Sequence, residues 1–433
     1  MQSGYFLSLQ SVQMKTTPHI GLYLPNTSNK NLILTQIMQN RFLYEYIDLS
    51  KLQGALYSSI TIDRMINDEL RHDRILVHTE ENESLQTMSS GQQKKALLAY
   101  LIAQQPDYIV LDDVYSNVDI ATQQYITKTL SKLSEQVLLI QLFFRKRDLL
   151  PCIDVVCQLD EKNEIISVQA ADEFRKLSST STEKPHEFKL PTLYSENHNN
   201  LETLVELHSV SAKYGDKQVL SDINWTIRKG EFWQLIGPNG AGKSTLISMI
   251  TGDNPKAYGQ NMILFGRKKG SGETIWDIKR QIGYFTPTMI QQFTRAESVE
   301  NMIISGLNDS VGLYTIPTDI QKDISKSWLQ MLGPSFRNKN FQQLSLGQQR
   351  MVMVARAMVK HPPLLILDEP TIELDDENSR LFIDMVKAIA AEKQMAIVYV
   401  SHRAEDDLQP DKVFELIKTE NGFTGKVRVP EDI

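Results

Sequence analysis

One loop in the second half of the chain has the residue types and spacing that bind phosphate groups. The segment 231–250 reads EFWQLIGPNGAGKSTLISMI, an apolar strand pattern, a glycine-rich loop and then a helix pattern. The loop follows the spacing Gly-x4-Gly-Lys-Ser and consists of Gly237, Pro238, Asn239, Gly240, Ala241, Gly242, Lys243, Ser244 and Thr245. Glycines let backbone N–H groups turn toward a phosphate, and the helix N-terminus adds partial positive charge. We expect Lys243 to reach the β- and γ-phosphates of a nucleotide and the Ser244 hydroxyl to reach Mg²⁺.

Acidic and aromatic residues elsewhere in this half fit the same chemistry. The strand pattern LLILD ends in Asp368, suited to hold Mg²⁺ through water, and Glu369 follows at once and could polarise an attacking water. His402 ends the next apolar strand, and Tyr214 precedes the loop, where it could stack on a base. Alone, each has a plainer explanation: a surface aromatic, a packed histidine or a strand-end acidic pair. Their order around the phosphate loop favours a nucleotide site.

The chain contains the same plan twice. Residues 88–119 align with 344–375 without a gap, and each copy is a loop, a helix pattern, a proline, an apolar strand and an acidic pair. A further helix, an apolar strand and a hairpin follow in both copies. Helices alternating with apolar strands indicate α/β domains, each with a mostly parallel sheet flanked by helices.

The repeat divides the chain into two domains. The first covers 1–170 and the second 201–433. The segment 171–200 is rich in Ser, Thr, Asn, Pro and charged residues, and we expect a flexible linker there.

The first half has a degenerate copy of the phosphate loop. The segment 21–37, GLYLPNTSNKNLILTQI, aligns with 234–250 and keeps Pro25, Asn26 and Lys30. Leu24, Thr27 and Asn29 replace the three glycines, and the hydroxyls that follow the lysine are also lost. Side chains at glycine positions crowd a phosphate and restrict the backbone. This half is also shorter between its loop and the repeated segment, so we expect a reduced domain without a working site of its own.

These motifs together resemble the ATP-binding cassette (ABC) ATPases over essentially all of 201–433. The resemblance implies a P-loop NTPase fold that binds ATP and Mg²⁺. Leu344-Ser345-Leu346-Gly347-Gln348 matches the signature motif, Asp368 the Walker B aspartate, Glu369 the catalytic glutamate, Asp375 the D-loop aspartate and His402 the switch histidine. The stretch 251–284 resembles tandem cassettes of the molybdate-transport or photorepair type. Where the family commonly has a glutamine that relays to a transporter subunit, this chain has Pro287, with Gln291 and Gln292 nearby.

A second signature motif survives in the first half as Ser89, Gly91 and Gln92. In the resembling family, ATP binds between the phosphate loop of one domain and the signature of another. The resemblance therefore implies one competent site, built from the second-half loop and the Ser89 signature, with the two halves pairing with each other or with a second chain. The alternative is that 88–92 is only a helix cap, since Ser and Gly favour such turns.

Composition indicates which binding partners and which cellular compartment to expect. The net charge of −7 and pI of about 5.7 make nucleic acid an improbable partner. Two cysteines, Cys152 and Cys157, indicate a reducing compartment. The sequence has no long apolar run and no leader pattern, so we expect a cytoplasmic protein, peripheral at the inner membrane face if a partner holds it there.

Three functions remain open at this stage. The first is an ABC ATPase that serves a transporter, with integral-membrane subunits as partners and molybdate or another oxyanion as cargo. The second is a soluble non-transport ABC protein such as a ribosome-associated factor. The third is a nucleotide-dependent clamp with slow or no turnover, which the loss of the glutamine at Pro287 permits.

Overall fold

The computed structural model describes residues 17–26, 28–44, 46–72, 84–116, 118–178, 186–191, 201–401 and 408–429. The chain forms two compact units, Met1–Lys184 with Glu373–Asp376, and Pro185–Ile372 with Glu377–Ile433. None of the described helices combines the length and the apolar character that a membrane span requires.

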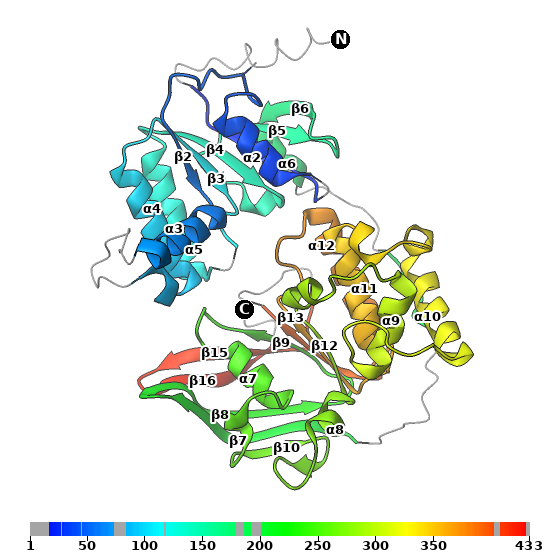
Figure 1. Ribbon diagram of the computed structural model, residues 1–433. Helices are drawn as coiled ribbons and strands as arrows, with labels where there is room; N and C mark the ends of the chain where they lie inside the picture. Colours follow the sequence, from blue (N-terminus) through cyan, green and yellow to red (C-terminus); the bar gives the residue numbers. More distant parts are fainter. Residues whose placement is uncertain are drawn as a thin grey trace. The chain divides into compact units, whose positions relative to one another are not determined.

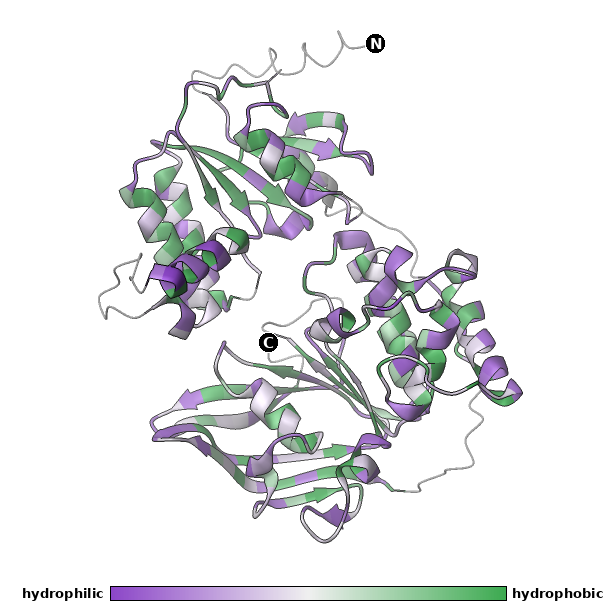
Figure 2. Cartoon of the chain, in the orientation of Figure 1, coloured by the Kyte–Doolittle hydropathy of each residue, from purple (hydrophilic) through white to green (hydrophobic). Residues whose placement is uncertain are grey.

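The first unit is built on a mostly parallel sheet covered on both faces (Figure 1). Its strands have the spatial order β2-β3-β4-β1-β5-β6, and only β6 runs antiparallel to its neighbour. One face packs on α3 to α6, and the other packs on α2. Figure 2 shows the buried strands as apolar, which is typical of parallel sheets with two covered faces. The elements are β1 (Ile20–Tyr23), α2 (Lys30–Met38), β2 (Gly54–Tyr57), α3 (Ser59–His72), α4 (Ser90–Ala103), β3 (Tyr108–Asp112), α5 (Ile120–Leu133), β4 (Leu138–Phe143), β5 (Val155–Leu159), β6 (Ile165–Ala170) and α6 (Ala171–Ser178).

The second unit is larger and joins an antiparallel region to a parallel one. Its strand order is β11-β10-β7-β8-β16-β15-β9-β14-β13-β12. The core connects α7 to both regions, while α9, α10 and α11 pack together at one side (Figure 1). The elements are β7 (Thr203–Tyr214), β8 (Lys217–Arg228), β9 (Phe232–Ile236), α7 (Lys243–Ile250), β10 (Asn261–Leu264), β11 (Arg267–Lys268), α8 (Ile275–Lys279), β12 (Ile282–Phe285), α9 (Val299–Ser305), α10 (Asp319–Leu332), α11 (Leu346–Met358), β13 (Leu364–Asp368), α12 (Asp376–Ala391), β14 (Ala396–Val400), β15 (Lys412–Thr419) and β16 (Gly422–Arg428).

The two sheets confirm the repeat that the sequence predicts. Read from the outer hairpin inward, the first unit runs β6-β5-β1-β4-β3-β2, and the second runs β16-β15-β9-β14-β13-β12. Each strand of the first unit therefore has a counterpart in the same order, and β1, β3 and β4 correspond to β9, β13 and β14. The predicted α/β class with mostly parallel sheets is correct for both halves.

The first unit is reduced in the places that its sequence indicates. Its described residues contain no counterpart of the antiparallel strands β7, β8, β10 and β11. Between β2 and α4 the described residues form α3, where the second unit has both α9 and α10. The range 171–200, expected to be a flexible linker, begins instead with helix α6. Ala171 and Phe174 are buried against the first unit, and burial of these apolar side chains explains why the segment folds.

An aromatic cluster fixes the outer hairpin of the second unit to the parallel strands. Phe414 of β15 is fully buried and stacks on Trp225, with ring centroids 4.4 Å apart and planes 13° apart. Trp233 of β9 meets both rings edge-on. All four tryptophans of the chain lie in 201–433, so tryptophan emission reports on the second unit alone.

Replacing Phe414 by alanine should destabilise the second unit by about 3–5 kcal/mol, because it removes a buried ring and leaves a cavity. Urea unfolding followed by tryptophan emission measures the change. Tyr314→Ala is the matched control, since that ring is 69% exposed, and its effect should stay within about 0.5 kcal/mol. Equal effects of the two substitutions would contradict the role of the cluster.

Candidate functional site

Neighbouring parallel strands bring the predicted site residues to one edge of the second sheet. β9, β14 and β13 lie side by side, and their register pairs Leu235 with Val400 and Val400 with Asp368. The phosphate loop follows β9 and Glu369 follows β13. Ligands of parallel α/β sheets bind at the carboxyl ends of the strands, because the loops leave the sheet there. The loop and the acidic pair therefore share one edge.

The phosphate loop ends at a helix N-terminus that no side chain caps. α7 begins at Lys243, and its cap residue Gly242 has a left-handed φ of 93°. The first N–H groups of a helix have no intrahelical partner and attract anions. A Cβ on Gly242 would lie 2.7 Å from Leu220 Cδ2, so only glycine lets the loop pack this closely on β8.

Lys243 lies inside the loop rather than on the surface. Its side chain is buried, and Nζ donates to the carbonyl oxygens of Gly237 at 2.7 Å and Pro238 at 3.3 Å. The ammonium thus closes the loop on itself. Because these are hydrogen bonds to neutral carbonyls, an anionic phosphate oxygen is a stronger alternative acceptor for the same group.

The acidic pair lies where β13 ends, with Asp368 as the last residue of the strand and Glu369 directly after it. Tyr284 of β12 donates its hydroxyl to Asp368 Oδ2 at 3.4 Å. Burial and the nearby Asp368 charge raise the pKa of Tyr284, so its hydroxyl stays protonated as a donor. Glu369 has a left-handed φ of 51°, and its backbone N–H donates to Val400 O at 2.9 Å.

The oxygen donors near the loop fit Mg²⁺. Ser244 exposes a hydroxyl in the first turn of α7, and Asp368 supplies a partly exposed carboxylate. Magnesium is usually bound by one or two carboxylates, water and substrate phosphates rather than by a complete protein cage. Ser244 and Asp368 are the residues that would hold it here.

Sequence reasoning missed two residues at this edge. Gln234 lies buried in β9, and its side-chain Nε2 donates to Ser401 Oγ at 2.9 Å, which ties the end of β14 to β9. Tyr284 is the second. Their signal was present as a polar residue inside the apolar pattern FWQLI and a tyrosine inside IGYF. His402 lies outside the described residues.

Tyr214, the predicted base platform, is the last residue of β7 and is 45% exposed. Its hydroxyl accepts a hydrogen bond from Asn254 Nδ2 at 2.8 Å, and Lys256 Nζ lies 5.7 Å from the ring centroid. The ring is thus held at its tip and available at the surface for stacking. Pro287 starts the 3-10 segment η4 (Pro287–Gln292), in which Gln291 and Gln292 are exposed.

Both signature motifs form the same helix cap. Ser89 caps α4 and Ser345 caps α11, and each serine makes a reciprocal capping box with the glutamine three residues on, Gln92 or Gln348. The helix-cap interpretation of 88–92 is therefore correct as a description of its local structure. Within this cap the Ser89 hydroxyl donates to Gln92 Oε1 at 2.8 Å and accepts from the backbone N–H of Gln92 at 3.4 Å.

Packing around the signature glycines is close, and at Gly347 it leaves no room for a side chain. A Cβ on Gly347 would lie 2.1 Å from Asn378 Oδ1, and one on Gly91 would lie 3.2 Å from Thr122 Oγ1. The helices that carry the two signatures approach their neighbours closely at these positions.

Comparison with known proteins agrees with this geometry. A family model described as "ABC transporter" matches residues 220–372. The chain is 35% identical to the ABC transporter ATP-binding protein ModF of Escherichia coli over 333 residues, which cover 74% of this chain and 67% of ModF. It is 34% identical to the zinc uptake system ATP-binding protein ZurA of Listeria monocytogenes, over 47% of this chain and 77% of ZurA.

A solved structure shares the fold over nearly the whole chain. It is the archaeal ribosome recycling factor aABCE1 in complex with the ribosomal stalk protein aP1, with a TM-score of 0.59, 15% identity, and coverage of 95% of this chain and 85% of that one. At this identity the likeness concerns the fold. The ModF match carries the assignment, and this chain belongs to the family of ABC transporter ATP-binding proteins.

Proposed function

We propose that this chain binds Mg-ATP on its second unit and hydrolyses it. The carrying observation is the α7 N-terminus, which lacks a side-chain cap, follows a glycine loop and has Lys243 buried beside it. Asp368 ends β13 and Glu369 follows it, at the same edge of the sheet as the loop. The family, which hydrolyses ATP, supports the same reaction.

Each residue of the site has a distinct part in this proposal. The loop N–H groups and Lys243 bind the phosphates, and Tyr214 stacks on the base. Ser244 and Asp368 would hold Mg²⁺, whose charge would offset that of the phosphates when it is bound. Glu369 orients the attacking water and accepts its proton, and His402 senses the γ-phosphate.

The site is completed, in this proposal, by the signature of the first unit. The Ser89 hydroxyl that caps α4 donates to Gln92 Oε1 at 2.8 Å. In this proposal the hydroxyl turns to a γ-phosphate oxygen when ATP binds, because a charged oxygen is a stronger acceptor than an amide oxygen. The first unit then acts as a lid over the competent site. The lid comes from the same chain or from a second copy.

The biological role we propose is service to a transporter, with integral-membrane subunits as partners. The names of ModF and ZurA support a transport setting, and the resemblance to molybdate cassettes suggests an oxyanion as cargo. Pro287 favours a second candidate, a nucleotide-dependent clamp without transport, because proline has no side-chain amide to relay to a subunit. Copurification with an integral-membrane protein supports transport, and cosedimentation with ribosomes supports a non-transport role.

Hydrolysis is tested by steady-state phosphate release from Mg-ATP. Lys243→Ala should abolish both binding and turnover. Glu369→Gln should bind ATP but turn it over about 10²–10⁴ times more slowly, because the general base is lost. If wild-type protein binds ATP but releases phosphate no faster than Glu369→Gln, the result would contradict ATP hydrolysis and support a nucleotide-dependent clamp.

Gly242→Ala should weaken binding of a fluorescent ATP analogue by about 10- to 100-fold, since overpacking costs ~1–3 kcal/mol. The control is Gly259→Ala. Both glycines have positive φ, but a Cβ on Gly259 meets nothing within 4 Å. Binding should therefore survive in the control. Equal losses would point to backbone strain in general and not to the packing of the loop.

Ser89→Asp tests the lid without removing the helix cap. Aspartate caps helices as well as serine, but its charge repels a γ-phosphate. Turnover should fall by about 10²–10³-fold with folding unchanged. Ser345→Asp alters the matching cap of the other signature and should leave turnover intact. The reverse result would show that two second units build the site between chains, and normal turnover in both variants would reject either signature as a donor.

A further inference from the structure

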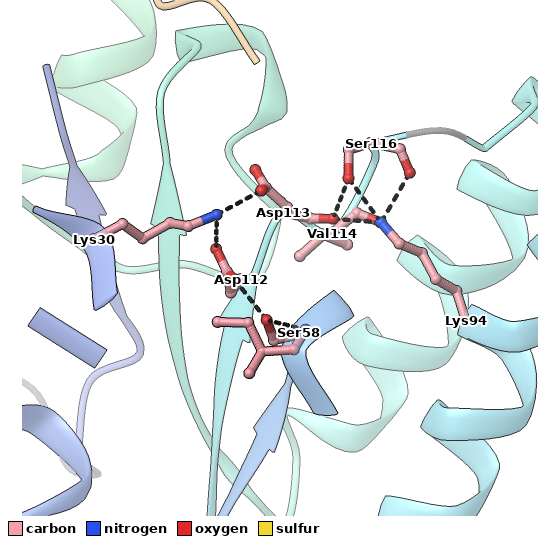
Figure 3. A network of polar contacts seen from close by, with 8 residues as sticks. Lys30, Ser58, Lys94, Asp112, Asp113, Val114 and Ser116 are labelled. Carbon is pink, nitrogen blue, oxygen red and sulfur yellow. Dashed lines mark hydrogen bonds and ion pairs between the residues drawn. The ribbon is translucent and has the colours of Figure 1, made fainter. Parts of the chain in front are cut away.

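The lysine of the degenerate loop has an arrangement unlike that of its counterpart. Lys30 starts α2, and its Nζ lies 3.1 Å from Asp112 Oδ1 and 2.7 Å from Asp113 Oδ2 (Figure 3). Lys243, at the same place in the second unit, donates to carbonyl oxygens of its own loop. In the first unit, therefore, the lysine of the loop forms ion pairs with both residues of the acidic pair.

The acidic pair of the first unit needs a cation. Asp112 is the last residue of β3 and Asp113 follows it, just as Asp368 ends β13 and Glu369 follows, and the Asp112 side chain is 1% exposed. Asp112 Oδ2 accepts a hydrogen bond from Ser58 Oγ at 2.7 Å, while its buried Oδ1 has the Lys30 ion pair but no hydrogen bond. Burial and the adjacent Asp113 charge raise the pKa of Asp112. Lys30 Nζ lies against both carboxylates, and a buried carboxylate without such a partner would be strongly destabilising.

Lys30 supplies that charge permanently. Burial by itself lowers the pKa of Lys30, but the charges of Asp113 and Asp112 outweigh it and raise the pKa above its ordinary value. The ammonium therefore remains protonated across the physiological range.

The helix N-terminus in the first unit is occupied as well. Asn29 caps α2, and its side-chain Oδ1 accepts from the backbone N–H of Leu32 at 3.1 Å. The corresponding terminus of α7 has no side-chain cap. A side-chain oxygen thus fills the place where the second unit leaves a helix N-terminus to an anion.

We infer that Lys30 takes the place of a divalent cation between Asp112 and Asp113, and that these carboxylates form a latent metal site which opens when the ammonium is removed. In the same way, the Asn29 side-chain oxygen takes the place of a phosphate oxygen at the N-terminus of α2. The first unit therefore keeps its acidic loop ordered without metal or nucleotide.

A second lysine, Lys94, connects the acidic loop to the helix that carries the signature. Lys94 of α4 is buried, and its Nζ donates to the carbonyl oxygens of Asp113 at 2.5 Å and Ser116 at 2.9 Å (Figure 3). Lys30 thus holds the side chain of Asp113 and Lys94 its carbonyl. The Ser89 cap lies about one turn before Lys94, so the acidic loop and the signature are connected within one unit.

The test measures Mn²⁺ binding by the full chain after metal and nucleotide have been removed. Binding is measured as the decrease in the electron paramagnetic resonance signal of free Mn²⁺. Lys30→Met should gain one tight Mn²⁺ site relative to wild type, because two carboxylates and the Ser58 hydroxyl are oxygen ligands suited to such an ion. Adding Asp113→Asn to that variant should remove the gain. Lys30→Arg, which keeps the positive charge, should bind no more Mn²⁺ than wild type.

Two results would overturn the inference. One is a wild-type site that Asp113→Asn abolishes, since the ammonium would then not exclude a metal. The other is a folded Lys30→Met variant without added Mn²⁺ binding. Lys30→Gln, which keeps a hydrogen-bond donor but loses the charge, serves if the methionine variant does not fold. Both results are independent of ATP turnover, because no nucleotide is present.

Discussion

The N-terminus of one helix in each unit, α2 after β1 and α7 after β9, sets the constraint on which the rest of the site depends. Its leading N–H groups must find acceptors, and a side chain or a bound anion can provide them. In the second unit a glycine precedes α7 and no side chain caps it, whereas in the first unit Asn29 caps α2. The helix of the first unit therefore has a side-chain acceptor at its N-terminus, and the proposed phosphate site of the second unit lies at a helix without such a cap.

The lysines at the start of these two helices also differ between the units. Lys243 rests on loop carbonyls, which a phosphate can replace, while Lys30 is paired with two carboxylates. A lysine held by carbonyls is available to a ligand, and one held by buried carboxylates is part of the fold, since removing it leaves uncompensated charge in the interior. The absence of the glycines and the ion pairing of the lysine therefore occur together in the loop of the first unit.

The signature motif of the first unit has a structural use that does not depend on a ligand. Ser89 and Gln92 satisfy the first turn of α4 whether or not a ligand is near, and Lys94 fastens that helix to the acidic loop. The corresponding cation of the second unit is Arg350, which donates to Pro370 O at 2.6 Å. A structural role for the signature and the proposed role toward ATP are thus compatible.

The sequence by itself determined the α/β class, the repeat, the phosphate loop and the family resemblance, because these depend on local spacing and periodicity that neighbours in the chain can specify. Tertiary structure decided where side chains without local partners go. Lys30 reaches Asp112 and Asp113 across more than eighty residues, Tyr284 reaches Asp368, and Phe174 turns part of the expected linker into a helix. Charged and aromatic side chains interact with the groups that lie near them in space. The order of the strands in the sheet, and not the order of residues in the chain, decides which groups those are.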